Sequence, residues 1–271
     1  MQKLKRIFAW IAVILLVSMY VLSLVFALMK SEHAAFLFRA SLGCTILVPV
    51  LLYLFLLVAK AVRPGKSPVV DCIIFDVGRV LLDFPWKEHA EEADVPPECR
   101  KILNEKIVTS PLWGEFDLGI RPYEDIIDEF AAYAPEYEKE IRSFLTTLDD
   151  CISPYWYTED LLAGLKRKGY SLYYLSNWSE HSYNYLRGKG IMDFTRYMKG
   201  GIWSFREHLA KPDPKIYETL IRRYGLDPSR CLFIDDNEKN VAAAKKAGIG
   251  AILFTEYNDL IEKLSSCGVN L

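Results

Sequence analysis

Two long uncharged apolar runs near the N-terminus most constrain what this chain can fold into. They cover residues 7–29 and 40–59, and neither contains a charged side chain. A helix of roughly 20 apolar residues crosses the hydrocarbon core of a bilayer, so both runs predict transmembrane helices. A cleaved signal peptide is the alternative for the first run, but its apolar core is long for one and no small-residue cleavage site follows before Lys30.

The charges are distributed unevenly around these runs. Residues 1–66 contain eight basic and one acidic side chain, whereas the rest of the chain contains 25 basic and 34 acidic ones. Basic residues precede the first run and follow the second, so the positive-inside bias places both chain ends in the cytoplasm. We therefore expect a membrane anchor at residues 1–66, embedded in the bilayer through residues 7–59, and a cytoplasmic domain at residues 67–271.

The composition of that second part bears on its partners. Its acidic balance argues against a nucleic-acid partner, which favours a basic surface. The sequence points to no particular protein partner.

Short apolar runs alternate with helical patterns after residue 67. The predicted strands cover residues 69–75, 170–175, 231–234 and 251–254, and the helical patterns between the later ones cover residues 158–167, 214–224 and 239–247. This alternation predicts an α/β fold with a Rossmann-like parallel sheet covered on both faces. Residues 86–150 have helical periodicity punctuated by prolines, which predicts a helical cap of some four helices inserted after the first strand.

Polar residues follow the predicted strands. The segments FDVG, LSNW, AKPD and IDDN contribute Asp76, Ser176 with Asn177, Lys211, and Asp235 with Asp236. Ligands of parallel sheets gather at the carboxyl ends of the strands. We therefore expect a carboxylate, a hydroxyl, an ammonium group and a pair of acids to converge on one point.

In this order, the four segments together resemble the motifs of the haloacid dehalogenase superfamily, in its capped, sugar-phosphate-phosphatase-like branch. The resemblance extends from about Val69 to Phe254 and does not include the predicted anchor. It implies a Mg²⁺-dependent phosphohydrolase that acts on a small phosphorylated metabolite, such as a sugar phosphate. Cleavage of the phosphomonoester would proceed through an aspartyl-phosphate intermediate.

The resemblance implies roles for individual residues. Asp76 would be the nucleophile, which divides one difficult step into two easier ones. Lys211 would neutralise Asp76 and a phosphoryl oxygen, while the Ser176 hydroxyl would bind another oxygen. Asn177, beside them, would also contact the substrate. Trp113 and Glu115 of the cap segment PLWGEFDLG would face the substrate, although an aromatic side chain in a small helical bundle is more often part of its core.

The metal site is also implied by the resemblance. Mg²⁺ prefers oxygen ligands, and these would be the Asp76 carboxylate, the backbone carbonyl of Gly78 and Asp236. Asp235 would complete the site by orienting the waters of the metal.

Gly78 departs from the family pattern. Phosphatases of this family usually have at this position an aspartate that protonates the leaving oxygen, and such acid assistance contributes about 10²- to 10⁴-fold. We therefore expect a slower enzyme or a preference for good leaving groups. His208 is a candidate replacement, although a surface histidine is the simpler interpretation. Two alternatives stay open: a binding module that has lost turnover, and a hydrolase of another bond, such as a haloacid dehalogenase.

Overall fold

The computed structural model describes residues 17–29, 33–62, 70–108 and 110–271, and the chain divides into two compact units, residues 1–66 and 67–271. In the first unit, an apolar helix at Val17–Leu28 precedes α2 (Ala34–Val62). Among the described residues, only the Ala34–Leu51 part of α2 is long and apolar enough to cross a membrane. Such a helix near the N-terminus is equally compatible with a signal or transit sequence.

The expected pair of spans is thus not confirmed. The described part of the first run is a shorter apolar helix, and residues 7–16 of that predicted span lie outside the described residues. The second predicted span, residues 40–59, lies within α2, and several of its described apolar side chains, such as Ile46 and Leu47, are exposed. The described residues of this unit thus contain one candidate membrane span and one shorter apolar helix.

The second unit is built on a five-stranded parallel sheet with the order β5-β4-β1-β6-β7. The strands are β1 (Cys72–Phe75), β4 (Ser171–Ser176), β5 (Gly200–Trp203), β6 (Cys231–Asp235) and β7 (Gly250–Leu253). β1 is central and pairs in register with both neighbours, so that Phe75 lies opposite Tyr174 on one side and Ile234 on the other. This register aligns the carboxyl ends of β1, β4 and β6 at one edge, as the sequence predicts.

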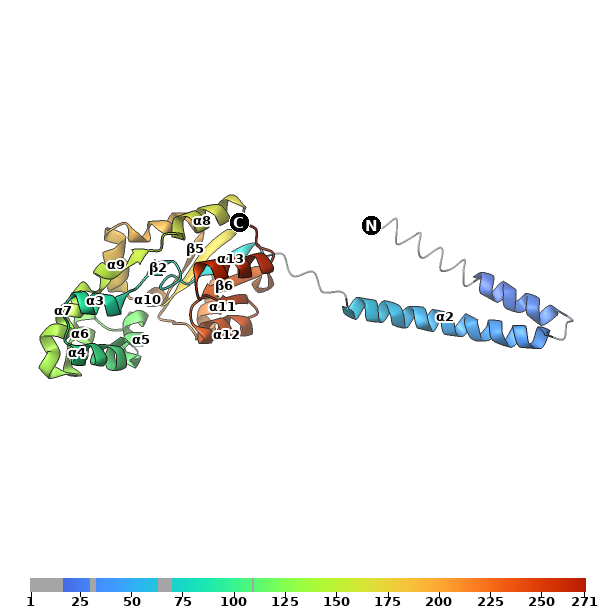
Figure 1. Cartoon of the computed structure of the whole chain (residues 1–271), viewed down its shortest axis with the longest axis horizontal. Coiled ribbons are helices and arrows are strands. Elements are labelled where there is room, and N and C mark those ends of the chain that lie inside the picture. The colour runs from blue at the N-terminus through green and yellow to red at the C-terminus, as the bar shows by residue number, and fades with distance from the viewer. Residues whose placement is uncertain (1–16, 30–32, 63–69, 109) are drawn as a thin grey trace. The chain divides into compact units, whose positions relative to one another are not determined.

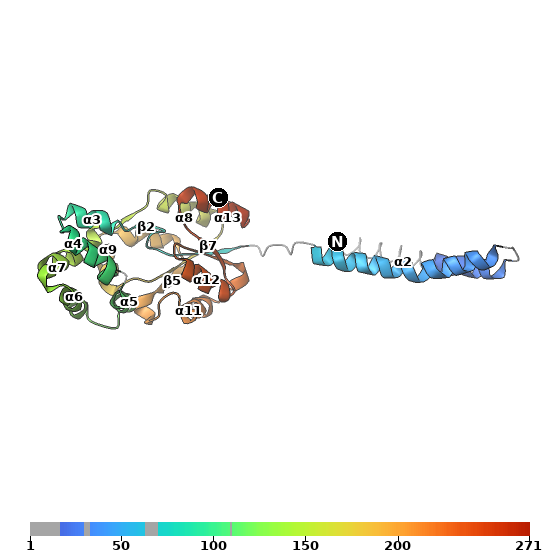
Figure 2. The ribbon, with the colours of Figure 1, turned by 60° about the horizontal axis from the view of Figure 1, so that its bottom comes forward.

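Alternate residues of β1 supply the two faces of the core. Ile73 and Phe75 pack on one face, while Cys72 and Ile74 pack on the other, and all four are buried. Figure 2 shows α8 and α13 on one side of the strands and α11 and α12 on the other. The helices of this core are α8 (Thr158–Arg167), α9 (Glu180–Gly188), α10 (Ser204–Glu207), α11 (Pro214–Tyr224), α12 (Glu238–Lys246) and α13 (Tyr257–Ser266), with 3₁₀ turns η4 (Ile191–Tyr197) and η5 (Pro228–Arg230).

A helical cap leaves and rejoins the core through a two-stranded antiparallel ribbon, β2 (Leu82–Asp83) with β3 (Ser153–Pro154). The cap has its own apolar core and lies at the end of the domain away from α11, α12 and α13 (Figure 1). Its elements are α3 (Trp86–Glu92), α4 (Pro97–Ile102), the π-helix η1 (Leu103–Val108), α5 (Pro111–Leu118), α6 (Tyr123–Ala132), η2 (Pro135–Tyr137), α7 (Glu138–Thr147) and η3 (Leu148–Cys151).

The cap contains more α-helices than the four expected, since the described residues form five. Proline marks their starts: Pro97 and Pro111 occupy the first helical position, and Pro96 and Pro122 precede a helix. A proline tolerates this position because the first N–H groups of a helix have no partner within it. The proline break at Pro96 and Pro97 separates α3 from α4 as the sequence indicates, so only the expected number of helices was too low.

Candidate active site

Asp76 follows β1 directly, and the strand holds its backbone because Asp76 N–H donates to the Ile234 carbonyl of β6 at 2.8 Å. Its side chain is buried and converges with groups from three other segments. Asp76 Oδ1 accepts from Ser176 Oγ at 2.9 Å and from the Val77 N–H at 2.7 Å, and it lies 2.8 Å from Lys211 Nζ. The structure therefore brings together Asp76, Ser176 and Lys211, as the sequence predicts.

Lys211 lies between two carboxylates. Its ammonium group is 2.8 Å from Asp76 Oδ1 and 2.7 Å from Asp235 Oδ2, and its side chain is almost completely buried. Removal from water alone would lower the pKa of Lys211, but the two carboxylates outweigh that effect and the net shift is upward. The cation is thus retained inside the protein, beside the candidate nucleophile.

Asn177 is placed differently from the expected substrate contact. Its Oδ1 accepts from the Lys211 N–H at 2.8 Å and its Nδ2 donates to the Lys211 carbonyl at 3.0 Å. The Asn177 amide thus forms two hydrogen bonds with the backbone of Lys211. This geometry fits a residue that positions Lys211 and also lines the cavity beside it.

Three carboxylates form a candidate cation site. One oxygen from each of Asp76, Asp235 and Asp236 lies within 4.8 Å of the other two. Gly78 lies on the same cavity, and within the described residues its carbonyl accepts no backbone hydrogen bond. An all-oxygen donor set suits a hard divalent cation such as Mg²⁺, so the residues present fit the metal that the sequence implies.

The Asp235 carboxylate differs from its neighbours because its oxygens are already engaged. It is completely buried and accepts from the Asn237 N–H, from Asn240 Nδ2 and from Lys211 Nζ. Such bonds fix its orientation, which suits a residue that supports the metal site indirectly. Asp236 is more exposed and forms a 3.3 Å ion pair with the exposed Arg79.

The site carries a surplus of negative charge. Burial raises the pKa of Asp76 to about 7, with Lys211 lowering it and Asp235 raising it. Burial also raises the pKa of Asp236. Lys211 and the exposed Arg79 thus face three acids that are partly removed from water, which makes the site attractive to a further cation.

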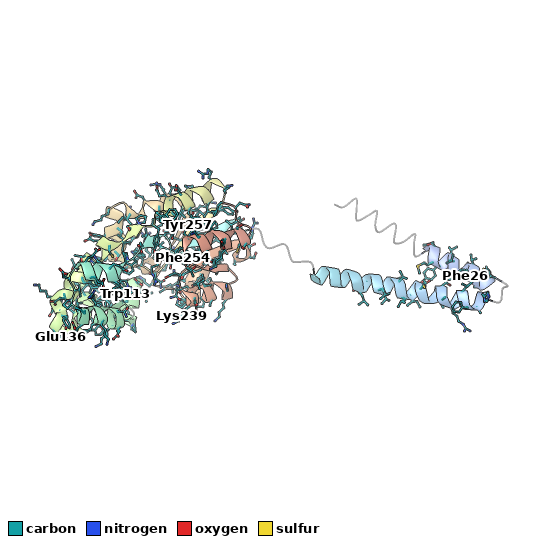
Figure 3. The ribbon with its side chains drawn as sticks, in the orientation of Figure 1. Phe26, Trp113, Glu136, Lys239, Phe254 and Tyr257 are labelled. Carbon is teal, nitrogen blue, oxygen red and sulfur yellow. The ribbon has the colours of Figure 1, made fainter. Side chains whose placement is uncertain are left out.

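These groups open on a cavity of about 330 Å³ between the sheet edge and the cap. The cap side contributes aromatic and apolar side chains, among them Trp113 of α5. Figure 3 labels Trp113 in the cap. Other apolar residues of the wall are Phe84, Phe116, Leu148, Ile152 and Trp178. Glu115 does not line this cavity and instead pairs with Arg121 at 3.2 Å. Of the two cap residues singled out in the sequence, Trp113 thus lines the cavity and Glu115 does not.

Gly78 lies against Trp178. A Cβ atom built on Gly78 would be 3.0 Å from Cζ3 of the Trp178 ring, closer than side chains normally approach. Gly78 has no left-handed backbone; that conformation belongs to Arg79, with φ of 61°. A side chain at residue 78 would therefore require the Trp178 ring to shift by a few tenths of an ångström.

The sequence reading missed Asp117, which lies in the same cavity. Asp117 is the next-to-last residue of α5, in the cap segment that also carries Trp113. Burial raises the pKa of Asp117 to about 7, with Lys211 lowering it and Asp76 raising it. Nothing in the sequence singles out this residue, since an acidic residue near the end of a helix has no distinguishing motif.

The histidines lie apart from the reaction centre. His208, the candidate replacement for the missing acid, is exposed and its Nδ1 bonds to the Leu118 carbonyl at 2.8 Å. His181 stacks on Tyr123 of the cap with ring centroids 3.7 Å apart. Neither lines the cavity of Asp76, so neither replaces the acid.

Comparisons with known proteins agree with this geometry. The haloacid dehalogenase-like hydrolase family matches residues 70–248. Flavin mononucleotide hydrolase 1 of Arabidopsis thaliana, a chloroplast protein, is 28% identical over 226 residues, which cover 77% of this chain and 81% of the relative. The sesquiterpene phosphatase astK of Aspergillus oryzae is 26% identical over 184 residues, which cover 68% of this chain and 89% of the relative.

A solved structure shares the fold. The haloacid dehalogenase family enzyme bt-2542 of Bacteroides thetaiotaomicron, in complex with magnesium and inorganic phosphate, aligns with a TM-score of 0.56 at 20% identity. The alignment covers 70% of this chain and 98% of that one. The comparisons thus confirm the expected superfamily and the α/β core. They also confirm an enzyme, with phosphatases among its relatives.

Proposed function

The chain belongs to the haloacid dehalogenase-like hydrolases, and we propose that it is a Mg²⁺-dependent phosphohydrolase, tethered to a membrane, that cleaves a small phosphomonoester through an aspartyl phosphate. The observation that carries this proposal is the convergence of Asp76, Ser176 and Lys211 with the three-carboxylate cluster on one cavity. A halide-displacing enzyme has no need of that cluster.

The residues of the site suggest how the reaction proceeds. A carboxylate oxygen of Asp76 attacks phosphorus while the bond to the leaving oxygen breaks, and water then hydrolyses the resulting acyl phosphate. Lys211 and Ser176 neutralise and bind the phosphoryl oxygens. Asp76, Asp236 and the Gly78 carbonyl would hold Mg²⁺, which supplies the positive charge that a carboxylate and a phosphate dianion need to approach each other.

The walls of the cavity bear on the leaving group. Trp113, Phe116 and Leu148 face the space beyond Asp76, next to polar groups such as Ser182. Burial of apolar area is the main source of affinity for such a surface. We infer a leaving group with an apolar or aromatic face; a sugar phosphate remains a candidate because sugar rings also pack on aromatic side chains.

Tethering rests on the apolar helix α2 and on the basic residues around the first unit. Its exposed apolar surface would be covered by lipid, and the positive-inside bias would keep the hydrolase domain in the cytoplasm. A second span at residues 7–29 stays part of this proposal.

The test is turnover of a panel of phosphomonoesters by the full chain, with and without Mg²⁺. The panel would contain 4-nitrophenyl phosphate, flavin mononucleotide and a sugar 1-phosphate. We expect Mg²⁺-dependent release of phosphate and its loss in Asp76→Asn, which keeps the shape and removes the attacking charge. Near-normal turnover by Asp76→Asn would refute the mechanism.

The same panel separates the two alternatives. Binding of phosphomonoesters without turnover would indicate a binding module. Release of halide from a 2-haloacid, in place of phosphate from the panel, would indicate a dehalogenase.

A further inference from the structure

The site lacks a proton donor where the family pattern places one. Without an acid, an alkoxide would have to leave as an anion, which is unfavourable. At Gly78 the ring of Trp178 fills the space of a side chain, at 3.0 Å from a Cβ atom. Trp178 is itself buried and packs edge-to-face on Trp203. Glycine itself offers no side-chain donor at residue 78, so a protein donor would come from another wall of the cavity.

Asp117 enters the cavity from the cap. Its backbone is fixed to the core because Ser204 Oγ donates to the Asp117 carbonyl at 2.5 Å, and His208 Nδ1 donates to the next carbonyl, that of Leu118, at 2.8 Å. Helices α5 and α10 pack together at this point. The position of Asp117 relative to Asp76 is thus set by hydrogen bonds between cap and core.

The Asp117 carboxyl group is available for chemistry. Within the described residues it forms no ion pair and no hydrogen bond through its side chain, whereas Asp76, Asp235 and Asp236 are all engaged. Burial raises the pKa of Asp117 to about 7, so a large share of the molecules carries a proton on this group near neutral pH.

A second cap carboxyl group, that of Asp149, also lines the cavity. Burial raises its pKa, and its electrostatic partners are Ser182, His181, Asp150 and Lys189. The main electrostatic influences on Asp117, in contrast, are Lys211 and Asp76. Of the two cap acids, Asp117 is therefore the one whose charge is coupled chiefly to the reaction centre.

We propose that Asp117 is the general acid of this enzyme, delivered from cap helix α5 to the leaving oxygen in place of a donor at residue 78. The inference rests on the proposed phosphohydrolase function. As the phosphorus–oxygen bond breaks, its electron pair goes to the leaving oxygen, which takes the proton of Asp117. The Asp117 carboxylate then takes a proton from the water that attacks the aspartyl phosphate, and the carboxylate of Asp76 is released.

The test compares two substrates of nearly equal size, 4-nitrophenyl phosphate and 4-nitrobenzyl phosphate. The first releases a stable phenolate and the second an alkoxide that requires a proton. In Asp117→Asn, kcat/KM for the benzyl ester should fall by about 10²-fold or more, while the phenyl ester should lose only a small part of its rate. We use kcat/KM because it reports departure of the leaving group even where hydrolysis of the acyl phosphate limits kcat.

Asp149→Asn is the matched control, since it removes a cap carboxylate from the same cavity and should leave the ratio of the two rates unchanged. Equal losses on both esters in Asp117→Asn, or no loss on either, would overturn the role of Asp117 while the proposed function stands. If Asp117→Asn does not fold, Asp117→Ser provides the same comparison. A wild-type protein that hydrolyses neither ester would overturn the proposed function itself.

Discussion

The contact between Gly78 and Trp178 allows a quantitative prediction. In Gly78→Ala the new Cβ would lie 3.0 Å from Cζ3 of Trp178, whereas carbon atoms prefer about 3.5–4.0 Å. The ring has little room to retreat because Trp178 is only 8% exposed. Overpacking of this kind costs about 1–3 kcal/mol, and a Gly→Ala change at an unstrained position recovers about 0.4–1 kcal/mol.

The net expectation is a loss of about 1 kcal/mol in the free energy of unfolding. For a domain of this size, that corresponds to a fall in Tm of about 2–4 °C. Thermal unfolding of the full chain in detergent, followed by tryptophan fluorescence, would measure it. Gly164→Ala is the control because Gly164 lies inside α8 and a Cβ there would meet only Arg167 Nη2, at an ordinary contact distance of 4.0 Å; this change should stabilise the helix by about 0.5–1 kcal/mol.

The two substitutions should therefore shift Tm in opposite directions. A second comparison tests the cause, because Trp178→Phe removes the part of the ring that would be struck. In that background the cost of Gly78→Ala should shrink, with an interaction free energy of at least about 0.5 kcal/mol. A Gly78→Ala protein as stable as Gly164→Ala would refute the claim that a side chain at residue 78 must displace the Trp178 ring.

Other predictions concern the charges of the site and the membrane. Lys211→Met leaves Asp76 and Asp235 without their cation, so denaturant unfolding should show a loss of about 3–5 kcal/mol and phosphatase assays should show background activity; unchanged stability would contradict the buried ion pairs. Asp236→Asn should raise the Mg²⁺ concentration for half-maximal activity about tenfold or more, with turnover recovered at high Mg²⁺; loss that Mg²⁺ does not restore would point to another role. Protease added outside intact cells should leave residues 67–271 uncut, and their digestion would overturn the cytoplasmic assignment.

The sheet and its catalytic edge were predictable because their sequence signals are local. Each central strand is a short apolar run followed at once by a polar residue, and parallel pairing then aligns the ends of those runs. Helices α8 and α11 begin and end where their periodicity predicts. The strand β5 was missed, since its two glycines, Gly200 and Gly201, are typical of a turn. A Cβ on Gly201 would lie 2.3 Å from the Tyr174 carbonyl, so the close approach of β4 requires glycine in this strand.

The cap side of the site depends on tertiary contacts that leave no local pattern. Trp113 was found because its segment resembles a family motif, whereas Asp117 lies in the same segment without a signal of its own. Asp117 stands out only through its contacts in the folded chain. Its carbonyl accepts from Ser204, 87 positions away, and its carboxyl group interacts with Lys211 and Asp76, 94 and 41 positions away. Asn177 was found as a polar residue after β4. Its two hydrogen bonds with the Lys211 backbone depend on how the loop folds and leave no pattern in the sequence.

One buried hydroxyl connects the glycine and the proposed acid. Ser204 Oγ accepts from the Trp178 N–H at 2.8 Å and lies 2.5 Å from the Asp117 carbonyl. A hydroxyl has one proton to donate, so the shorter contact to Asp117 takes it and the 3.2 Å contact to the Trp178 carbonyl is secondary. The Ser204 side chain thus holds both Trp178, whose ring lies against Gly78, and helix α5, which carries Asp117.

This arrangement has a consequence for specificity. A donor two residues after the nucleophile belongs to the core and acts on any ester bound there, whereas Asp117 shares helix α5 with Trp113 and Phe116 of the cavity wall. On the proposed mechanism, the helix that contacts the leaving group also protonates it. A leaving group that packs poorly on α5 then loses acid assistance as well as binding, so poor substrates with alkoxide leaving groups should show a lower kcat in addition to a higher KM.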